Sequence, residues 1–212
     1  MDPSLRQRIR DDDPSALGEL FDQEARAVYR HALRVSGNPQ VAEDVVSLTF
    51  LEAWRVRHRL RPEGDGLLPW LLGIATNVHR NLARSTRRHR AALARLPPRD
   101  AVADFSHETV ERMADAERLR AVRTAMKRLR QADRDVFALC VWSGLDHAAA
   151  AEALGIPVGT VRARLSRART RLAKLTDEEL RRNRAETERP PATGQHQASR
   201  IQAARSTQET AR

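Results

Sequence analysis

The stretch that decides the fold lies at residues 145–165 and reads LDHAAAAEALGIPVGTVRARL. Its first part is rich in alanine, a strong helix former, and it meets Gly155, which can adopt the positive φ that closes a helix. Pro157 then suits the first turn of a second helix. Two helices joined by a tight turn that contains glycine are typical of a helix-turn-helix unit. The stretch therefore predicts an element that contacts DNA.

The second of these helices separates apolar from basic side chains. The residues that share its apolar stripe are Val161, Leu165, Ala168, Leu172 and Leu175. This stripe has helical period and predicts the face that packs in the core. Residues 158–175 also contain six basic residues and no acidic one. A solvated helix usually mixes both signs, so this pattern favours an anionic partner over the alternative of a solvated arginine face.

A second basic run lies at residues 77–95, which contain six arginines and no acidic residue. The helix that carries it begins in an apolar segment, so one end is expected in a core and the other in solvent. Asn77, Arg80, Asn81 and Arg84 recur at helical spacing and can share a face. Asparagine can read base edges and arginine can bind phosphates. The alternative is that the asparagines cap the helix or fill polar places in the core.

The whole chain has 212 residues and a formal charge of +10, and Lys127 and Lys174 are its only lysines among 38 basic residues. Arginine suits planar contacts with phosphate and guanine, although genome composition explains the bias equally well. Cys140 is the only cysteine, which excludes an internal disulfide and a thiolate-rich zinc site. No apolar run is long enough to span a bilayer or to form a signal peptide. We expect a soluble protein of a reducing compartment, with nucleic acid as its first candidate partner.

Helix-forming residues dominate, and no stretch alternates like a strand bounded by turns, so we predict an all-α protein. Asp-Pro at 13–14 is typical of an N-cap followed by a first-turn proline. Gly-Asn-Pro at 37–39 predicts the end of one helix and the start of the next. We expect further helices over about 39–59 and about 69–95, separated by a loop at 61–66.

The pattern divides the chain into two small helical domains, at 1–95 and 107–175. Two prolines interrupt the helical pattern within residues 96–106, which we interpret as a flexible linker. The extension at 176–212 loses the helical period, and Ile201 is the only large apolar residue towards its end. We expect this extension to be mostly disordered, because it cannot bury enough surface to offset its chain entropy.

The helix expected at about 39–59 has apolar side chains around most of its circumference. Val41, Val45 and Leu48 lie on one side, and Leu51 and its apolar neighbours lie on another. One side can pack on neighbouring helices, and the rest is either deeper core or a docking surface for a protein. From this segment alone we favour core.

Three segments resemble the extracytoplasmic-function (ECF) sigma factors of the sigma-70 family. NPQVAEDVV at 38–46, with TFLEAW at 49–54, is similar to the family's polymerase-clamp helix. PWLLGIATN at 69–77 is similar to the element that engages the −10 promoter region, and IPVGTVRARLSRAR at 156–169 is similar to the helix that reads the −35 region. The chain departs from the usual polar pair of the clamp helix at Ser47-Leu48.

The resemblance implies a region 2 helical bundle at 1–95 and a region 4 helix-turn-helix at 107–175, without catalytic residues, metal or cofactor. The implied −35 contacts are Thr160, Arg162, Ala163, Arg164, Ser166, Arg167 and Arg169. The implied −10 contacts are Asn77, Arg80, Asn81, Arg84, Arg87 and Arg88, with the loop at 61–68. The implied polymerase contacts are Asp44, Val45, Leu51 and Trp54.

The resemblance also implies the partners. The partners are promoter DNA and bacterial core RNA polymerase, which would bind through its β′ clamp and its β flap. The activity of the chain would be restrained either by an anti-sigma factor or by its own long tail. We expect the chain to be cytoplasmic. It should be monomeric when free and should lie on the nucleoid when it is part of the holoenzyme.

Two other classes compete with this reading. The first is a repressor or activator that binds DNA without polymerase. The apolar helix at about 39–59 and the two basic runs at 77–95 and 158–175 disfavour this class. A recombinase or nuclease is the other, but the sequence lacks GxxxxGK, HExxH and GxSxG runs, and its histidines show no ligand spacing.

Overall fold

The structure is a computed structural model that describes residues 4–63, 66–93 and 113–187, and those residues form helices without strands. The predicted all-α class is confirmed. The linker expected at 96–106 lies outside the described residues. The elements are α1 (Leu5–Arg10), α2 (Pro14–Ser36), α3 (Pro39–Arg55), the 3-10 turn η1 (Arg57–Arg59), α4 (Leu68–Leu93), α5 (Met113–Arg128), α6 (Gln131–Phe137), the π-helical turn η2 (Ala138–Trp142), α7 (His147–Leu154) and α8 (Val158–Thr187).

The helix ends lie where the capping residues predict them. The Asp13 carboxylate accepts from the Ser15 amide (2.9 Å) at the start of α2, and Asn38 accepts from the Val41 amide (3.3 Å) at the start of α3. Gly37 and Gly155 end α2 and α7 with φ values of 68° and 63°. These left-handed conformations favour glycine, because it has no Cβ to clash with the backbone.

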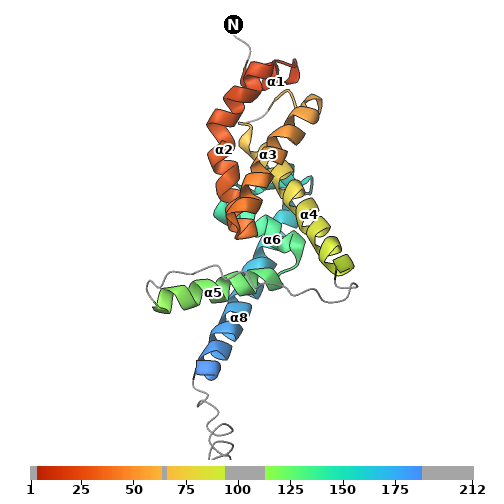
Figure 1. Ribbon diagram of the computed structural model, residues 1–212. Coiled ribbons are helices and arrows are strands. Elements are labelled where there is room, and N and C mark those ends of the chain that lie inside the picture. The colour runs from red at the N-terminus through yellow and green to blue at the C-terminus, as the bar shows by residue number, and fades with distance from the viewer. Residues whose placement is uncertain (1–3, 64–65, 94–112, 188–212) are drawn as a thin grey trace, which may run out of the picture.

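Helices α1 to α4 form the first helical group, in which α2, α3 and α4 pack against one another and α1 lies at one end (Figure 1). Their core contains Leu20, Val28, Val45, Leu71 and Leu72, none of which is more than 1% exposed. The end of α3 differs slightly from expectation, because regular α-helix stops at Arg55 and a 3-10 turn follows.

Helices α5 to α8 form the second helical group, in which α5 crosses α8 and α6 and α7 pack near the start of α8 (Figure 1). The predicted stripe of α8 is confirmed. Val161, Leu165, Ala168 and Leu175 are buried, and Leu172 is half-buried.

Helix α8 is longer than predicted, and the expectation that structure fades from Thr176 is wrong up to Thr187. Glu179 explains the difference. Its side chain is 3% exposed and accepts a hydrogen bond from Arg128 of α5 (2.9 Å), with a second ion pair to Arg182. The hydrogen-bond partner of Glu179 lies 51 residues away in the sequence. The helical periodicity of residues 176–187 therefore does not predict that α8 continues through them. The rest of the predicted extension, 188–212, lies outside the described residues.

The two helical groups are in contact, since α7 packs on α4 and η2 packs on α2. No helix within the described ranges is both long and apolar enough to cross a bilayer.

Candidate nucleic-acid interface

The α7–α8 unit has the geometry of the predicted helix-turn-helix. Asp146 caps α7 by accepting from the Ala149 amide (2.7 Å). After Gly155, the amide of Ile156 donates to the Ala151 carbonyl (3.0 Å), which closes the end of α7. Helix α8 then begins directly after Pro157, whose carbonyl accepts from the Thr160 amide (2.9 Å). The turn is therefore held by its own backbone, and the direction in which α8 leaves it is fixed.

The side of α8 opposite its buried stripe carries the predicted −35 residues. Those that the structure leaves exposed are Arg162, Ala163, Ser166, Arg167 and Arg169, and those that it half-buries are Thr160 and Arg164. The exposed set forms one continuous face at the N-terminal half of the helix, which is the part that enters a major groove in helix-turn-helix proteins. An Arg167 nitrogen lies 3.6 Å from an oxygen of Asp133 in α6, a loose ion pair that DNA phosphate can replace.

Helix α4 places most of the predicted −10 residues on its outer side. The exposed ones are Asn77, Asn81, Arg84, Arg87 and Arg88. The first half of α4 is anchored by Leu71, Leu72 and Ala75, which are buried. One helix thus begins in the core and ends as an exposed basic rod, as the sequence predicts.

A groove of about 720 Å³ runs between α3 and α4 beside these residues. Asn77 and Asn81 line it together with Trp70, which is half-buried rather than enclosed in the core. Arg55 and Arg59 contribute basic side chains from the opposite wall. The groove combines amides, an indole ring and cations with one carboxylate, Glu52, which pairs with Arg55 (2.6 Å). Amides, aromatic rings and cations are the groups that hold an unpaired base and its phosphate.

Residues outside α4 complete this groove, and the sequence alone does not indicate them. Arg55 and Arg59 become neighbours of α4 only when α3 packs on it. Arg6 of α1 donates to the carbonyl of Arg61 (3.0 Å) and to that of Gly66, and so holds the loop before α4. No sequence signal marks Arg6, because its two acceptors are backbone carbonyls about sixty positions away.

Arg80, one of the predicted −10 residues, forms an ion pair within the protein. Two of its guanidinium nitrogens lie 2.8 and 2.5 Å from Asp135 Oδ2, and the Asp135 side chain is 1% exposed. Asp135 lies in α6, so this ion pair joins the two helical groups. Gln131 also donates to the second carboxylate oxygen (2.7 Å), which completes the partners of the buried charge.

The outer face of α3 carries an exposed apolar stripe. Leu51 is 68% exposed and Leu48 is 40% exposed, and Asp44 lies on the same side one turn earlier. The preference for core throughout this helix is therefore wrong for both leucines. Val45, also predicted to contact polymerase, is 0% exposed and packs in the core, so its side chain does not lie on this surface. Trp54 is half-buried, with the Arg57 guanidinium 4.2 Å above its ring.

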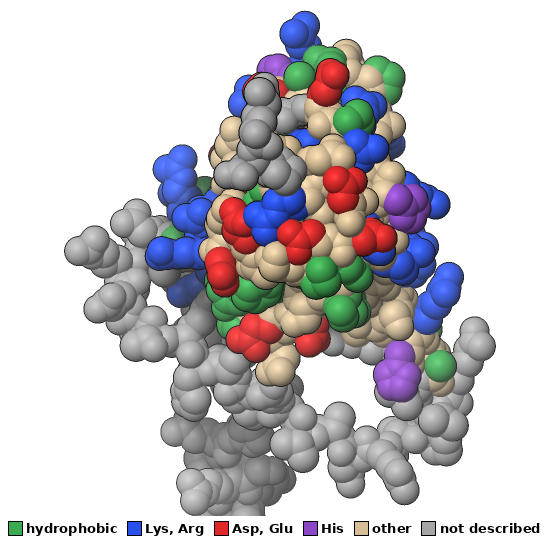
Figure 2. Space-filling model, turned by 90° about the horizontal axis from the view of Figure 1, so that it is seen from above, with side chains coloured by type: hydrophobic (Ala, Val, Ile, Leu, Met, Phe, Trp, Pro, Cys, Tyr) green, Lys and Arg blue, Asp and Glu red, His purple; other side chains and the backbone are tan. Residues whose placement is uncertain are grey.

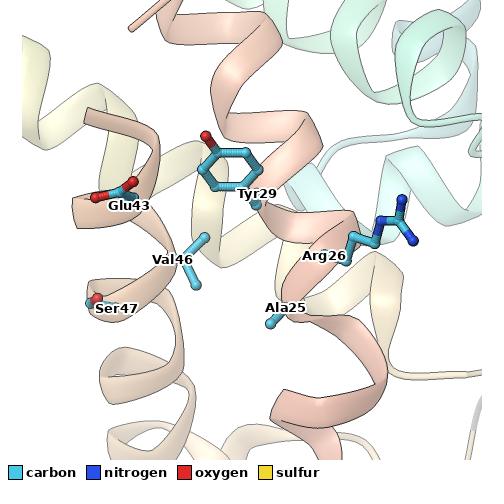
Figure 3. Close-up of a pocket in the computed structure, with 6 residues that line it drawn as sticks. All are labelled: Ala25, Arg26, Tyr29, Glu43, Val46 and Ser47. Carbon is cyan, nitrogen blue, oxygen red and sulfur yellow. The ribbon is translucent and has the colours of Figure 1, made fainter. Parts of the chain in front are cut away.

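A smaller groove of about 340 Å³ lies on the other side of α3, against α2. Ala25, Tyr29 and Val46 project into the space between the two helices, whereas Arg26 points away from α3 (Figure 3). Tyr29, the only tyrosine of the chain, is thus a partly buried packing residue.

Charge is distributed unevenly over the molecule. Seen from the α1 end, acidic side chains gather in the middle of the face, and Lys and Arg lie mainly along its two sides, one of which is the side of α4 (Figure 2). An anionic strand is therefore attracted to the α4 side rather than to this end. Among the described residues, no cluster of three or more His, Cys, Asp or Glu could hold a metal ion.

A buried histidine lies where the two helical groups meet. His31 is 4% exposed, its Nδ1 lies 2.9 Å from the Ser143 hydroxyl, and its Nε2 lies 3.4 Å from the Thr76 hydroxyl. The Thr76 hydroxyl donates to the Leu72 carbonyl, so Nε2–H donates to Thr76 and Nδ1 accepts from Ser143. Burial, followed by repulsion from positive charge nearby, lowers the pKa of His31 to about 4.

We expect acid to destabilise the fold through this histidine. The unfolded chain binds the His31 proton at about pH 6.5 and the folded chain only near pH 4, so stability falls as pH falls through this window. The expected loss is about 1 kcal/mol at pH 5.5 relative to pH 8. Urea unfolding at both pH values measures it, and His31→Asn, which does not titrate there, is the control. An equally steep loss in the variant would contradict the assignment.

The chain matches the sequence models of two protein families, one for each helical group. Residues 20–89 match the description "Sigma-70 region 2", and residues 119–172 match "Sigma-70, region 4". NccH, an RNA polymerase sigma factor of Alcaligenes xylosoxydans xylosoxydans, is 30% identical over 178 residues, which cover 82% of this chain and 94% of NccH. The ECF sigma factor SigL of Mycobacterium tuberculosis is 32% identical over 169 residues, covering 76% of this chain and 88% of SigL.

The chain belongs to the ECF RNA polymerase sigma factors. This sigma factor directs promoter recognition by RNA polymerase, and it is a non-catalytic subunit. The ECF sigma factor SigE of Mycolicibacterium smegmatis is also similar, with 34% identity over 158 residues; the match covers 73% of this chain but only 59% of SigE.

Solved structures show the same fold. CnrH in complex with the cytosolic domain of CnrY is similar to this sigma factor with a TM-score of 0.58 and 26% identity, covering 82% of this chain and 96% of CnrH. RpoE of Bartonella quintana, solved with the anti-sigma factor NepR, is similar with a TM-score of 0.55 and 24% identity, covering 76% of this chain and 96% of RpoE.

Proposed function

We propose that this sigma factor holds core polymerase through the outer face of α3 and reads two separate promoter elements, the −10 element with α4 and the −35 element with α8. The observation that carries the proposal is an exposed apolar side chain on the outer face of α3, Leu51 at 68% exposure, together with two exposed basic helices. Leu48 lies at the border of this face, because it also lines the groove between α3 and α4. A DNA-binding regulator that works without polymerase needs the basic helices but not the stripe.

The polymerase contact is assigned to Asp44, Leu48 and Leu51, which lie at i, i+4 and i+7 on one side of α3. Two exposed leucines beside a carboxylate provide both apolar area and a charge that fixes orientation. The β′ clamp is the proposed partner of this surface, and the β flap that of the second helical group. The family resemblance implies a polar pair at Ser47-Leu48, and the exposure of Leu48 on α3 supports a contact that is more apolar here.

The −10 element is assigned to the groove between α3 and α4. Asn77 and Asn81 offer amides that pair with base edges, and Trp70 offers a ring on which a base can stack. The exposed arginines farther along α4 are suited to the phosphates of the same strand. Turning a base out of the duplex costs a few kcal/mol, and these contacts offset that cost.

The −35 element is assigned to the exposed face of α8. The proposed major-groove contacts are Arg162, Ser166 and Arg167, all of which are exposed. Arg164 and Arg169 are the proposed contacts to the phosphate backbone. Thr160 and Ala163 complete the face at its N-terminal end. At the start of α8 the amides of Thr160 and Val161 are bonded to the Pro157 carbonyl, and those of Val158 and Gly159 are available to a phosphate.

An anti-sigma factor is a further proposed partner. Both similar structures are complexes with a partner protein, the cytosolic domain of CnrY or the anti-sigma factor NepR. A protein that covers the stripe on α3 would compete directly with polymerase. We further propose that the chain is cytoplasmic and monomeric until it binds one of these partners.

The test is capture of purified bacterial core polymerase followed by transcription of fragmented host DNA with mapped 5′ ends. We expect stoichiometric capture and initiation at a defined set of sites. Leu51→Asp is expected to weaken capture by about tenfold or more, because it places a charge in an apolar contact. Gln23→Asp, which adds a carboxylate on α2 outside the stripe, is the control and should bind like wild type. Absence of capture by the wild-type chain would refute the proposed function.

A further inference from the structure

The short helix α1 lies beside the backbone that connects the two walls of the groove between α3 and α4. This backbone runs from η1 to the start of α4, and the structure describes residues 60–63 and 66–67 of it. It leads from Arg59 on one wall of the groove to Trp70 on the other. Helix α1 contacts η1 at the end of the first helical group (Figure 1). The course of the η1–α4 connection therefore sets how far apart the two walls lie.

Arg6 of α1 bridges the beginning and the end of this connection. One terminal nitrogen of its guanidinium donates to the Arg61 carbonyl (3.0 Å), and the other donates to the Gly66 carbonyl. The guanidinium is a rigid planar fork, so the two carbonyls that it binds are held at a fixed separation. Arg61 follows Arg59 by two residues, and Gly66 precedes Trp70 by four. The Arg6 bridge thus acts on both walls of the groove through short stretches of backbone.

A second contact from the end of α1 holds η1. The Asp12 carboxylate forms an ion pair with Arg57 of η1. Asp12 has a φ of 66°, a left-handed conformation that is uncommon for residues other than glycine and that persists where surrounding contacts fix it. Arg57 in turn donates to the Trp54 carbonyl at the end of α3 (2.7 Å). The turn that leads to Arg59 is therefore held from α1 as well as from α3.

Helix α1 is itself anchored, which gives Arg6 a fixed base. Ile9 is buried, and it belongs to the same apolar cluster as Leu60 and Leu67 from the two ends of the connection. Arg8 forms an ion pair with Glu19 of α2 (2.8 Å) on the other side of α1. Apolar burial supplies most of the stability here, because partly exposed ion pairs contribute little.

The Arg6 bridge adds geometry rather than stability. Both of its acceptors are neutral backbone carbonyls, and both belong to exposed residues, Arg61 and Gly66. Water can take these bonds when Arg6 is replaced, so no buried polar group is left without a partner. Loss of the bridge therefore frees the connection without unfolding the helices on either side of it.

We propose that Arg6 is a positioning residue for recognition of the −10 element. By bridging Arg61 and Gly66 it sets the separation between Arg59 and Trp70, which must hold a phosphate and an unpaired base at the same time. A wider or less rigid groove still binds a single strand, but it distinguishes the correct base from a wrong one less well, since specificity needs contacts held to within about 0.5 Å. This role rests on the function proposed for the groove; the Arg6 bridge does not.

The first test is amide hydrogen exchange of Arg6→Gln in the full chain without any partner. The amide of Leu60 donates to the Arg57 carbonyl and that of Leu71 to the Leu67 carbonyl, each at 3.0 Å, so the two amides report on the two ends of the connection. Both should exchange about tenfold faster in the variant, the effect expected from the loss of charge-assisted hydrogen bonds nearby. Exchange of the α8 amides should not change.

Arg26→Gln is the matched control for this measurement. Arg26 is exposed on α2 and points away from α3, and the substitution removes the same charge (Figure 3). Exchange at Leu60 and Leu71 should stay as in wild type. Unchanged exchange of these amides in folded Arg6→Gln would overturn the bridge and with it the proposal.

The second test measures base discrimination by the holoenzyme. The probes are single-stranded oligonucleotides that carry the −10 element of a mapped promoter, with each base substituted in turn. Arg6→Gln should reduce the ratio of affinities for the correct and the wrong base by about tenfold at the position that the groove reads, which is the discrimination of one good base contact. Capture of core polymerase and binding of a −35 duplex should not change.

Arg6→Lys separates geometry from charge. Lysine keeps the positive charge and the apolar stem but lacks the planar fork, so it cannot hold two carbonyls at a fixed separation. It should lose most of the discrimination as well, and it carries both tests if Arg6→Gln does not fold. Full discrimination in Arg6→Lys would show that only the charge matters and would overturn the positioning role.

The two tests also separate this inference from the function proposed for the groove. Faster exchange in Arg6→Gln with an unchanged affinity ratio would overturn the positioning role. Faster exchange in the variant, with no base preference in the wild-type holoenzyme, would leave the bridge standing and refute the assignment of the groove to the −10 element instead.

Discussion

Leu72→Ala is expected to lower the free energy of unfolding by about 2–5 kcal/mol. Leu72 is 1% exposed in α4, where it belongs to the buried apolar cluster of the protein. Truncation removes buried methyl groups and leaves a cavity that the helices around it cannot fully close. The measurement is urea unfolding followed by far-ultraviolet circular dichroism at pH 8, where His31 is neutral in both states.

Leu51→Ala is the matched control, because it makes the same chemical change on a side chain that is 68% exposed. Its stability should stay within about 0.5 kcal/mol of wild type. If instead the two variants lose similar stability, Leu51 is part of the core and the stripe on α3 is not a docking surface. The pair thus separates the apolar side chains that hold the fold from those that are available to polymerase.

Arg167→Ala is expected to weaken specific binding of promoter DNA by the holoenzyme by about tenfold to a hundredfold. Arg167 is exposed on the proposed major-groove face of α8. A well-formed arginine–guanine pair contributes about 1–3 kcal/mol of discrimination. Fluorescence anisotropy with a promoter identified by the transcription mapping measures the change, and the loss should be larger for that promoter than for non-specific DNA.

Arg181→Ala is the control for charge. Arg181 is exposed on the same helix, about 20 Å farther along it at 1.5 Å per residue. Removal of either arginine lowers the net charge equally, so a general electrostatic effect would weaken both variants alike. Equal weakening at Arg167 and Arg181, or none at Arg167, would show that α8 does not read the −35 element through this face.

The helix boundaries were predictable because their causes are local. Asp13, Asn38 and Asp146 accept from amides within three residues, and Gly37 and Gly155 take conformations that few other residues tolerate. The stripe of α8 was equally visible, since helical period alone brings its members to one face. The places where prediction went wrong involve partners that are far away in sequence.

Val45, Leu48 and Leu51 show this difference within a single helix. All three are apolar, and the sequence places them around α3 without saying which side meets α2 and α4. Packing against those helices buries Val45 and leaves the two leucines exposed. Composition therefore indicates a surplus of apolar surface on α3. Packing against α2 and α4 decides which part of that surface stays exposed.

The sequence by itself determined the helices, the two basic faces and the glycine-containing turn between α7 and α8, because each depends on residues within one or two helical turns. Only the tertiary structure decided that α8 continues to Thr187, that Arg80 is bound to Asp135, and that Gly73 lies against Ala153. Each of these depends on two segments brought together by packing. The free energy of such a contact depends on both residues together, so the local sequence around either residue does not predict it.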